Sequence, residues 1–316
     1  MRVMITGIAG FVGHHCSRYF PIVHPGMEII GLDSLQSSNL DIQGPTFKYH
    51  CVDLLDRQRV RAFIQNNPVE YLLHLASFSS VSFSWEKPAE SFLNNTMIFI
   101  NLVEAIKDFC PSCRILSIGS SEEYGDIAPS ELPVNESHPL RPRSPYGAAR
   151  ISQELLSEVF CSGYGLDIVM TRSFNHIGAF QRESFVVPAF VRQFVQAERE
   201  GKSVVRLKVG DIDVVRDFTD VVDVVSAYDL LLQKGGKGQA YNVCSGKGHQ
   251  LREIIGYIEK IMNIKADIEI DQGIMRPLEN REIVGDNSKI FHDCGWVPEH
   301  EIESSLKSVV EYWRSR

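Results

Sequence analysis

Three glycines spaced three residues apart, directly behind a short apolar run, are the feature that most constrains the fold of this chain. Residues 2–6 predict a buried strand, and Gly7, Gly10 and Gly13 follow it as a stretch of helical periodicity begins. In such a strand–turn–helix unit the first glycine permits the tight turn, the second lets the backbone approach a pyrophosphate, and the third lets helix and strand pack closely. The helix N-terminus then faces the phosphate groups. The spacing therefore predicts a dinucleotide site at the start of the chain.

Short apolar runs alternate with helical segments through the first half of the sequence. Further strands are expected at residues 28–33, 47–52, 71–74, 114–119 and 167–171, and helices at residues 12–20, 56–66, 90–109 and 146–162. Apolar strands separated by helices are typical of a parallel sheet that is covered on both faces. We expect an α/β fold with a doubly wound parallel sheet.

The alternation loosens after residue 171, where glycine, polar residues and short elements become more frequent. Helical periodicity returns at residues 220–232 and 302–313. We expect a dinucleotide-binding domain and a smaller, partly discontinuous domain, with ligand bound in the cleft between them. The expected boundaries are residues 1–172 plus about 218–241 for the first domain, about 173–217 and 242–290 for the second, and 291–316 for a C-terminal helical segment.

Charge and composition exclude several classes of partner. The 316 residues carry a formal net charge of −8, and basic residues form no stripe that could follow a nucleic-acid backbone. No apolar run is long enough for a membrane span. The 7 cysteines, an odd number without regular spacing, favour a reducing compartment, with the cytoplasm as the default. His14, His15 and His176 lack metal-ligand spacing, so no metal is expected.

Asp33 bears on the choice of dinucleotide. It stands at the end of the second expected strand, where a carboxylate can accept hydrogen bonds from both adenosine ribose hydroxyls and repels a 2′-phosphate. Residues 34–38 contain no Arg or Lys that could bind such a phosphate. The sequence therefore favours NAD(H), with NADP(H) as a possible cofactor.

Further motifs follow the glycine turn in a fixed order. Asp53 and Leu54 come after the third expected strand, Leu75 and Ala76 after the fourth, Ser120 after the fifth, and Tyr146 stands four residues before Arg150. This order resembles that of the extended short-chain dehydrogenases/reductases, over the whole chain. The resemblance implies a Rossmann domain whose cofactor contacts come from Gly7, Gly10, Phe11, Val12, Gly13, Asp33, Asp53, Leu54, Leu75, Ala76, Tyr146 and Arg150.

Within that family, six segments look most similar to the GDP-4-keto-6-deoxy-mannose reductases, which are siblings of the GDP-mannose 4,6-dehydratases. These segments are residues 119–125, 144–147, 172–178, 209–211, 215–220 and 242–246. The resemblance implies a GDP-sugar substrate whose C4 keto group is reduced to give a product of the GDP-6-deoxy-mannose (GDP-rhamnose) type, for surface polysaccharide, or the reverse oxidation at C4. It also suggests a homodimer through the helices at residues 90–109 and 146–162.

The chemistry explains the residues of the expected reaction centre. Hydride addition to a C4 carbonyl leaves an alkoxide that needs a proton, and a phenol beside a cation is a suitable acid. We expect Tyr146 to donate the proton and Ser120 to hydrogen-bond the same substrate oxygen; acid–base help of this kind is worth about 10² to 10⁴ in rate. Arg150 stands where the family has lysine. Arginine keeps the positive charge and can bond ribose hydroxyls, but it cannot shuttle a proton.

Two alternatives stay open. The related dehydratases use a glutamate at the position of Glu122 as the base that removes the C5 proton, which keeps a GDP-mannose 4,6-dehydratase, or another nucleotide-sugar dehydratase or epimerase, under consideration. A non-catalytic protein that binds NAD and a nucleotide sugar is the second alternative, and Arg150 is its support in the sequence.

The resemblance also assigns the nucleotide end of the substrate. Arg216 and Arg276 would grip the diphosphate, Asn175 would contact it, and Glu279 would hold the nucleotide ribose. Planar guanidinium groups suit this task, since a chain of net charge −8 has to supply local cations. Asn95 matches a family asparagine that helps to order the active site.

Overall fold

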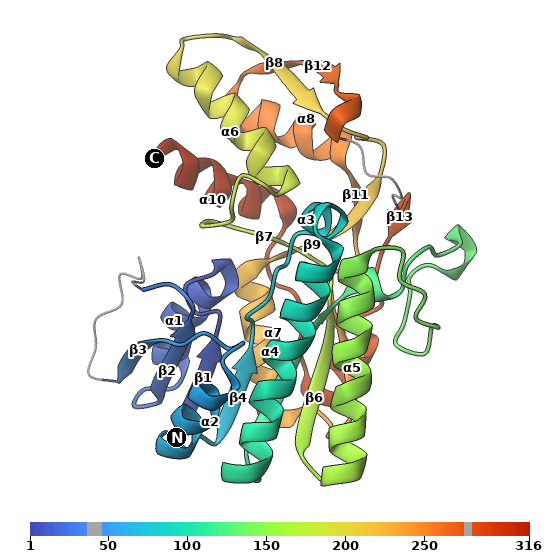
Figure 1. Ribbon diagram of the computed structural model, residues 1–316. Coiled ribbons are helices and arrows are strands. Elements are labelled where there is room, and N and C mark those ends of the chain that lie inside the picture. The colour runs from blue at the N-terminus through green and yellow to red at the C-terminus, as the bar shows by residue number, and fades with distance from the viewer. Residues whose placement is uncertain (37–45, 275–279) are drawn as a thin grey trace.

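A seven-stranded sheet forms the centre of the larger part of the molecule in the computed structural model, which describes residues 1–36, 46–274 and 280–316 (Figure 1). Its strands, in spatial order, are β10 (Ala240–Val243), β6 (Asp167–Ser173), β5 (Arg114–Ser120), β4 (Tyr71–His74), β1 (Arg2–Thr6), β2 (Glu28–Asp33) and β3 (Phe47–Cys51). All neighbouring strands are parallel. The strand order reverses between β1 and β4, and ligands bind at such switch points, beyond the carboxyl ends of the strands. The doubly wound α/β fold predicted from the sequence is confirmed.

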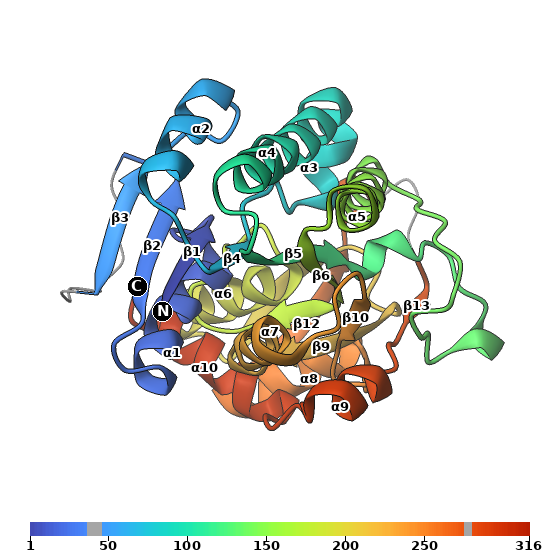
Figure 2. The same cartoon turned by 90° about the horizontal axis from the view of Figure 1, so that it is seen from below.

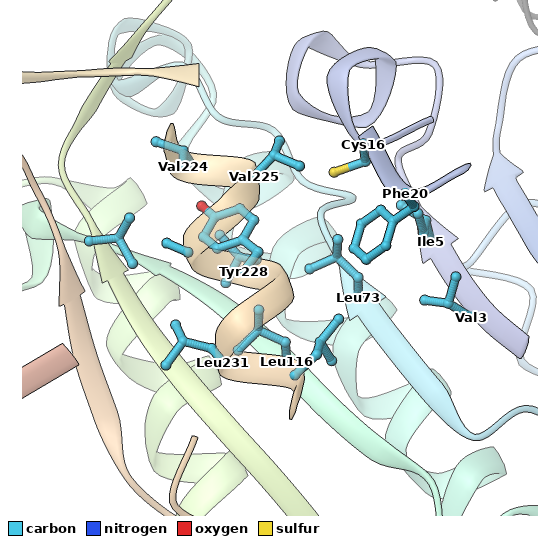
Figure 3. Packing of buried hydrophobic residues seen from close by; sticks show 14 of the residues in the cluster. Val3, Ile5, Cys16, Phe20, Leu73, Leu116, Val224, Val225, Tyr228 and Leu231 are labelled. Carbon is cyan, nitrogen blue, oxygen red and sulfur yellow. The ribbon is translucent and has the colours of Figure 1, made fainter. Parts of the chain in front are cut away.

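Helices cover both faces of this sheet (Figure 2). One layer contains α2 (Arg57–Asn66), α4 (Pro88–Phe109) and α5 (Pro145–Tyr164); the other contains α1 (Phe11–Val23), α7 (Val221–Lys234) and α9 (Ser288–Cys294). Phe20, Leu73 and Tyr228 belong to the apolar core on the α1 and α7 side (Figure 3). A second core separates the sheet from α2, α4 and α5. Because both faces are buried, inner strands such as β1 and β4 are largely apolar runs, whereas the edge strand β3 is more polar and more exposed.

The smaller part lies over the carboxyl end of the large sheet (Figure 1). One small sheet contains β7 (Asn175–Ile177), β9 (Val215–Asp220), β11 (Gly248–Gln250) and β13 (Glu282–Ile283), and a parallel pair contains β8 (Val204–Val209) and β12 (Lys265–Ile270). The helices of this part are α6 (Val186–Arg199), α8 (Leu251–Met262) and α10 (Ile302–Arg314). Their apolar faces share one core. Helix α9 packs instead on the core of the large sheet, so the residues after 287 divide between the two cores.

Some element bounds differ from those expected. The helix expected at residues 90–109 begins at Pro88, whose fixed φ suits the first helical position, and a separate α3 (Val81–Glu86) precedes it. Strand β6 continues to Ser173, because Gly119 and Ser120 of β5 still pair with it. Short 3₁₀ turns are η1 (Ser121–Glu123), η2 (Pro129–Glu131) and η3 (Gln272–Ile274). Among the helices in the described ranges, none has the length and apolar character needed to cross a membrane.

Candidate active site

The glycine turn is closed against the end of β4. Gly7 has φ +69°, and a Cβ atom there would lie 2.8 Å from the backbone nitrogen of Ala76. A Cβ atom at Gly13 would lie 2.5 Å from the carbonyl oxygen of Ile8. Real Cβ atoms do not approach so closely, so both positions require glycine. The turn leads directly into Phe11 and Val12 at the start of α1, which is the turn and helix N-terminus that the glycine spacing predicts.

Asp33 braces this turn from the end of β2. Its Oδ2 accepts a hydrogen bond from the Ala9 backbone nitrogen at 3.0 Å, and its Oδ1 accepts one from Leu35 at 3.3 Å. Each carboxylate oxygen can accept a second bond, so these contacts leave capacity for ribose hydroxyls. Asp33 therefore has a structural task as well as the ligand-binding task expected of it.

The loops after β3 and β4 border the same edge of the sheet. Leu75 donates its backbone N–H to the Thr6 carbonyl at 3.2 Å, and Ala76 donates to Thr6 Oγ1 at 3.2 Å. Leu54 is buried and its carbonyl accepts from the Asn101 amide at 2.9 Å, whereas Asp53 is exposed. The predicted cofactor residues of β1, β3 and β4 thus lie at the carboxyl end of the sheet.

Tyr146 and Arg150 lie one turn apart on α5. Ser144 caps this helix by accepting a hydrogen bond from the Gly147 backbone nitrogen at 3.0 Å. Arg150 donates from Nε to the Tyr146 hydroxyl at 3.1 Å. Both side chains are buried, at 6% exposure for Tyr146 and 4% for Arg150. The structure therefore places a fixed cation against the phenol.

Other protein groups hold the Arg150 guanidinium. One terminal nitrogen donates to the Ile118 carbonyl at 3.0 Å and to Gln153 Oε1 at 2.8 Å, and the other donates to Ser77 Oγ at 2.5 Å. Gln153 in turn donates to Ser117 Oγ at 2.8 Å. A lysine has a single nitrogen and could not reach all of these acceptors at once, so the surroundings of Arg150 are suited to a planar guanidinium.

Ser120 ends β5 next to the start of α5. Its Oγ accepts a hydrogen bond from the Glu122 backbone nitrogen at 3.3 Å. A Cβ atom at Gly147 would lie 2.7 Å from the Glu122 carbonyl oxygen, so η1 and the first turn of α5 are in tight contact. The expected reaction-centre residues Ser120, Glu122 and Tyr146 are therefore carried by adjoining elements.

His74 lies behind this centre and stays neutral. Burial and the nearby Arg150 charge lower the pKa of His74 to about 3. Its Nδ1 hydrogen-bonds Thr6 Oγ1 at 2.9 Å. His176 is half-buried as a residue, but its ring is shielded from water, which lowers its pKa to about 4, and its Nε2 lies 3.4 Å from the Tyr228 hydroxyl.

The predicted nucleotide-binding residues that the structure describes lie in the smaller part. Asn175 on β7 pairs with Phe218 on β9, and Arg216 on β9 is buried and donates to the Val215 carbonyl at 2.8 Å. Arg276 and Glu279 lie outside the described residues. Asp217, the residue after Arg216 on β9, accepts hydrogen bonds from the backbone nitrogens of Ser245, Gly246 and Gly285 at 2.8, 2.9 and 3.2 Å. It also accepts one from Ser245 Oγ at 2.6 Å.

Asn95, which was expected to help order the site, hydrogen-bonds the loop after β4. Its side-chain oxygen accepts from the Phe78 N–H at 2.8 Å, and its side-chain nitrogen donates to the Phe78 carbonyl at 3.1 Å.

Two other residues near the site, Ser77 and Gln153, were not anticipated from the sequence. Gln153 could have been suspected from its three-residue spacing to Arg150 on a helix, which places the two side chains on one face. Ser77 carried no comparable signal.

A Rossmann sheet with a dinucleotide turn, and a tyrosine paired with a cation four residues later, define an extended short-chain dehydrogenase/reductase that depends on NAD(P). The model of the GDP-mannose 4,6 dehydratase family matches residues 4–309. The chain belongs to this family of nucleotide-sugar enzymes.

Individual relatives cover nearly the whole chain. GDP-6-deoxy-D-mannose reductase from Pseudomonas aeruginosa is 33% identical over 315 residues, which span 100% of this chain and 98% of the relative. The solved structure of RMD from Pseudomonas aeruginosa complexed with NADPH has a TM-score of 0.86 at 32% identity, covering 99% of this chain and 97% of that one. UDP-glucose 4-epimerase from Thermus thermophilus, solved in complex with NAD, has a TM-score of 0.88 at 26% identity and covers 99% of both chains.

Proposed function

We propose that this protein reduces the C4 keto group of a GDP-4-keto-6-deoxy-hexose, or catalyses the reverse oxidation. The observation that carries the proposal is the 3.1 Å hydrogen bond from Arg150 Nε to the Tyr146 hydroxyl, beside the dinucleotide turn. The 33% identity to a GDP-6-deoxy-D-mannose reductase supports the choice of substrate. In this proposal residues 1–172 and about 218–241 hold the cofactor, and about 173–217 and 242–290 hold the nucleotide sugar.

The proposed chemistry assigns one task to each residue of the centre. The bound nicotinamide supplies or accepts the hydride. Tyr146 donates the proton that the C4 oxygen needs, and the Arg150 charge stabilises the phenolate that remains. Ser120 donates a hydrogen bond to the same oxygen. Because its bonds to Ile118, Gln153 and Ser77 fix the guanidinium, Arg150 acts as a positioned charge and not as a proton relay.

The nucleotide end of the substrate would be held by the smaller part. Arg216 and Arg276 are proposed to bind the diphosphate, with Asn175 beside them and Glu279 on the ribose. Arg216 is buried on β9, and burial makes the charge of a guanidinium act more strongly on a phosphate. The net charge of the chain is −8 and would repel a diphosphate, so these basic side chains have to provide the local attraction.

Two observations bear on the dinucleotide, and they point in opposite directions. Asp33 at the end of β2 favours NAD(H), because its carboxylate would repel a 2′-phosphate. The similar RMD structure was solved with NADPH, which supports NADP(H). We propose that the protein accepts both and prefers NAD(H).

A dehydratase is the second candidate, and Glu122 is the observation that favours it. Glu122 is half-buried on η1, directly after the Ser120–Ser121 pair and in contact with the start of α5. A dehydratase restores its cofactor in each turnover and releases water, so it gives no net change in nicotinamide absorbance. A non-catalytic binder would give neither a change in absorbance nor a new sugar.

The experiment is a panel of GDP-mannose and of GDP-, dTDP- and UDP-4-keto-6-deoxy sugars with NADH or NADPH, with the products identified by NMR and the binding of NAD and GDP measured by calorimetry. The proposal expects net oxidation of the cofactor and a C4 hydroxyl on the GDP-sugar product. Conversion of GDP-mannose to a 4-keto-6-deoxy sugar without net oxidation of cofactor would establish the dehydratase instead. Binding of NAD and GDP with no turnover of any sugar would establish the non-catalytic alternative.

We also propose a homodimer through α4 and α5, which lie side by side on one face of the sheet (Figure 2). Large apolar side chains are exposed on both helices: Leu93 at 58% and Met97 at 40% on α4, and Leu155 at 54% and Val159 at 56% on α5. Contiguous exposed apolar side chains are typical of an interface between protein chains. Light scattering should give twice the mass of the chain, and Leu155→Glu should give the monomer.

A further inference from the structure

Two carboxyl groups lie buried together behind Ser120. Glu123 on η1 is 0% exposed, and its Oε1 accepts a hydrogen bond from the Ser120 backbone nitrogen at 2.6 Å. Glu154 on α5 is also buried, and it forms a two-pronged pair with Arg172 of β6, at 3.0 Å from Nε and 2.6 Å from a terminal nitrogen. The Glu154 carboxyl group lies close enough to Glu123 for the two to share a hydrogen bond if one of them carries a proton. The pair therefore links the end of β5 to α5.

The charges around this pair do not balance unless one carboxyl group is neutral. Within the described part of the chain, Arg172 is the cation that faces both groups, and its fork is taken up by Glu154. Its other terminal nitrogen donates to the Tyr124 hydroxyl at 3.1 Å and to the Glu136 carbonyl at 2.9 Å. Two buried carboxylates cannot both be ionised beside one cation without strong repulsion.

The hydrogen bonding leads to the same conclusion. Glu123 Oε2 is buried and meets no donor among the described residues, so Glu154 is the group left to bond it. Two carboxyl groups can share a hydrogen bond only if one of them carries the proton. Burial, and then the charge of Glu154, raises the pKa of Glu123 well above its usual range.

We propose that Glu123 is a positioning residue: as a neutral carboxylic acid it donates a hydrogen bond to Glu154, accepts one from the Ser120 backbone, and so fixes Ser120 relative to Tyr146 on α5. The fit is close, because a Cβ atom at Gly119 would lie 2.4 Å from Glu123 Oε1, and only glycine leaves room for the carboxyl group there. The role rests on the proposed reductase site, in which Ser120 and Tyr146 act on one substrate oxygen.

Infrared spectroscopy of the purified protein tests the protonation state without any substrate. At neutral pH the wild type should show the C=O stretch of a protonated carboxylic acid, and Glu123→Gln should lose it. Glu303→Gln is the matched control, since Glu303 is exposed on α10 and its substitution should leave the band in place. The proposal is overturned if the band is absent from the wild type or persists in Glu123→Gln.

Stability against pH gives a second readout that does not depend on turnover. The folded state holds the Glu123 proton more tightly than the unfolded state does, so wild-type stability falls as pH rises above the ordinary glutamate pKa. Glu123→Gln keeps both hydrogen bonds, since its amide oxygen can accept and its NH₂ can donate, and it should lack this fall. A wild type and a Glu123→Gln variant with parallel pH dependence would overturn the proposal.

The positioning role itself is tested by turnover. Glu123→Leu removes both bonds and should lower kcat by about tenfold to a hundredfold, as a displaced reacting group does, with little change in KM. Glu123→Gln should restore kcat and extend activity to higher pH. Equal kcat in Glu123→Leu and wild type, both folded, would contradict the role. If no keto sugar is turned over but the infrared band behaves as expected, the proposed function fails and the neutral Glu123 stands.

Discussion

Arg150 donates from Nε to the Tyr146 hydroxyl across a single turn of α5, over 3.1 Å. In the proposed mechanism this bond lets Arg150 supply the charge for which the family resemblance leads us to expect a lysine. The guanidinium has donors to spare, and Ser77, Ile118 and Gln153 accept them. The positive charge at the phenol is therefore retained, and it is held more rigidly than a flexible ammonium would be.

Arg150→Ala should lose most of the turnover, by about 10²-fold to 10⁴-fold, because the phenolate of Tyr146 loses its cation. Arg150→Lys should keep a substantial part of it, since a lysine ammonium preserves the charge near the phenol. Steady-state kcat with a GDP-4-keto sugar measures both. Arg206→Ala, on an arginine exposed in β8, is a suitable control. Unchanged turnover in Arg150→Ala would show that the Arg150 charge is not needed to stabilise the Tyr146 phenolate.

Gln153→Leu should weaken both the fold and the site. The substitution leaves one buried N–H of Arg150 without its partner, which costs about 1–3 kcal/mol for an unsatisfied polar group, and it removes one of the two hydrogen bonds that the Ser117 hydroxyl accepts. Urea unfolding measures the loss. A double-mutant cycle with Arg150→Lys should show that the two effects on kcat are not additive, and additivity would mean that Gln153 does not act through Arg150.

The sequence was sufficient where the signal is local. Gly7, Gly10 and Gly13 directly follow β1, and buried parallel strands such as β2 and β4 are apolar runs that can be recognised without knowledge of their neighbours. Ser77, the hydrogen bond from Gln153 to Ser117 and the Glu123–Glu154 pair could not be derived in this way. They join α5 to β4, β5 and η1, and such contacts exist only after the sheet has brought distant segments together.

Asp217→Asn should destabilise the smaller part at neutral pH. The two carboxylate oxygens accept four hydrogen bonds, from Ser245, Gly246 and Gly285. In asparagine one of these oxygens is replaced by an NH₂ group, which is a donor and would face N–H donors of the protein. The lost hydrogen bonds should lower the free energy of unfolding by about 1–3 kcal/mol. Urea unfolding gives the value, and Asp213→Asn, at an exposed site before β9, is the control. Equal stability of Asp217→Asn and wild type would show that this cluster contributes nothing.

His300 should make stability depend on pH. Burial opposes its charge, but the hydrogen bond from Nδ1 to Asp223 Oδ1 at 2.7 Å, and the charge of Asp223, outweigh it and raise the pKa of His300. The folded state then binds the proton more tightly than the unfolded state. The advantage of wild type over His300→Gln should be full below the ordinary histidine pKa and lost as pH rises through the raised value. Urea midpoints across this range measure it, with the exposed His292→Gln as control. A difference that is constant with pH would contradict the prediction.

Asp33→Asn should shift the cofactor preference toward NADPH. The asparagine oxygen can still accept the Ala9 N–H, so the glycine turn keeps its brace while the negative charge that repels a 2′-phosphate is removed. The ratio of kcat/KM for NADH to that for NADPH should fall, chiefly through KM for NADPH, and the folded stability should change little. Asp53→Asn, which neutralises an exposed carboxylate after β3, is the control: it shows whether the loss of any one negative charge at this edge of the sheet changes the cofactor preference. If the wild type prefers NADPH and Asp33→Asn leaves the ratio unchanged, the Asp33 carboxylate does not select the cofactor.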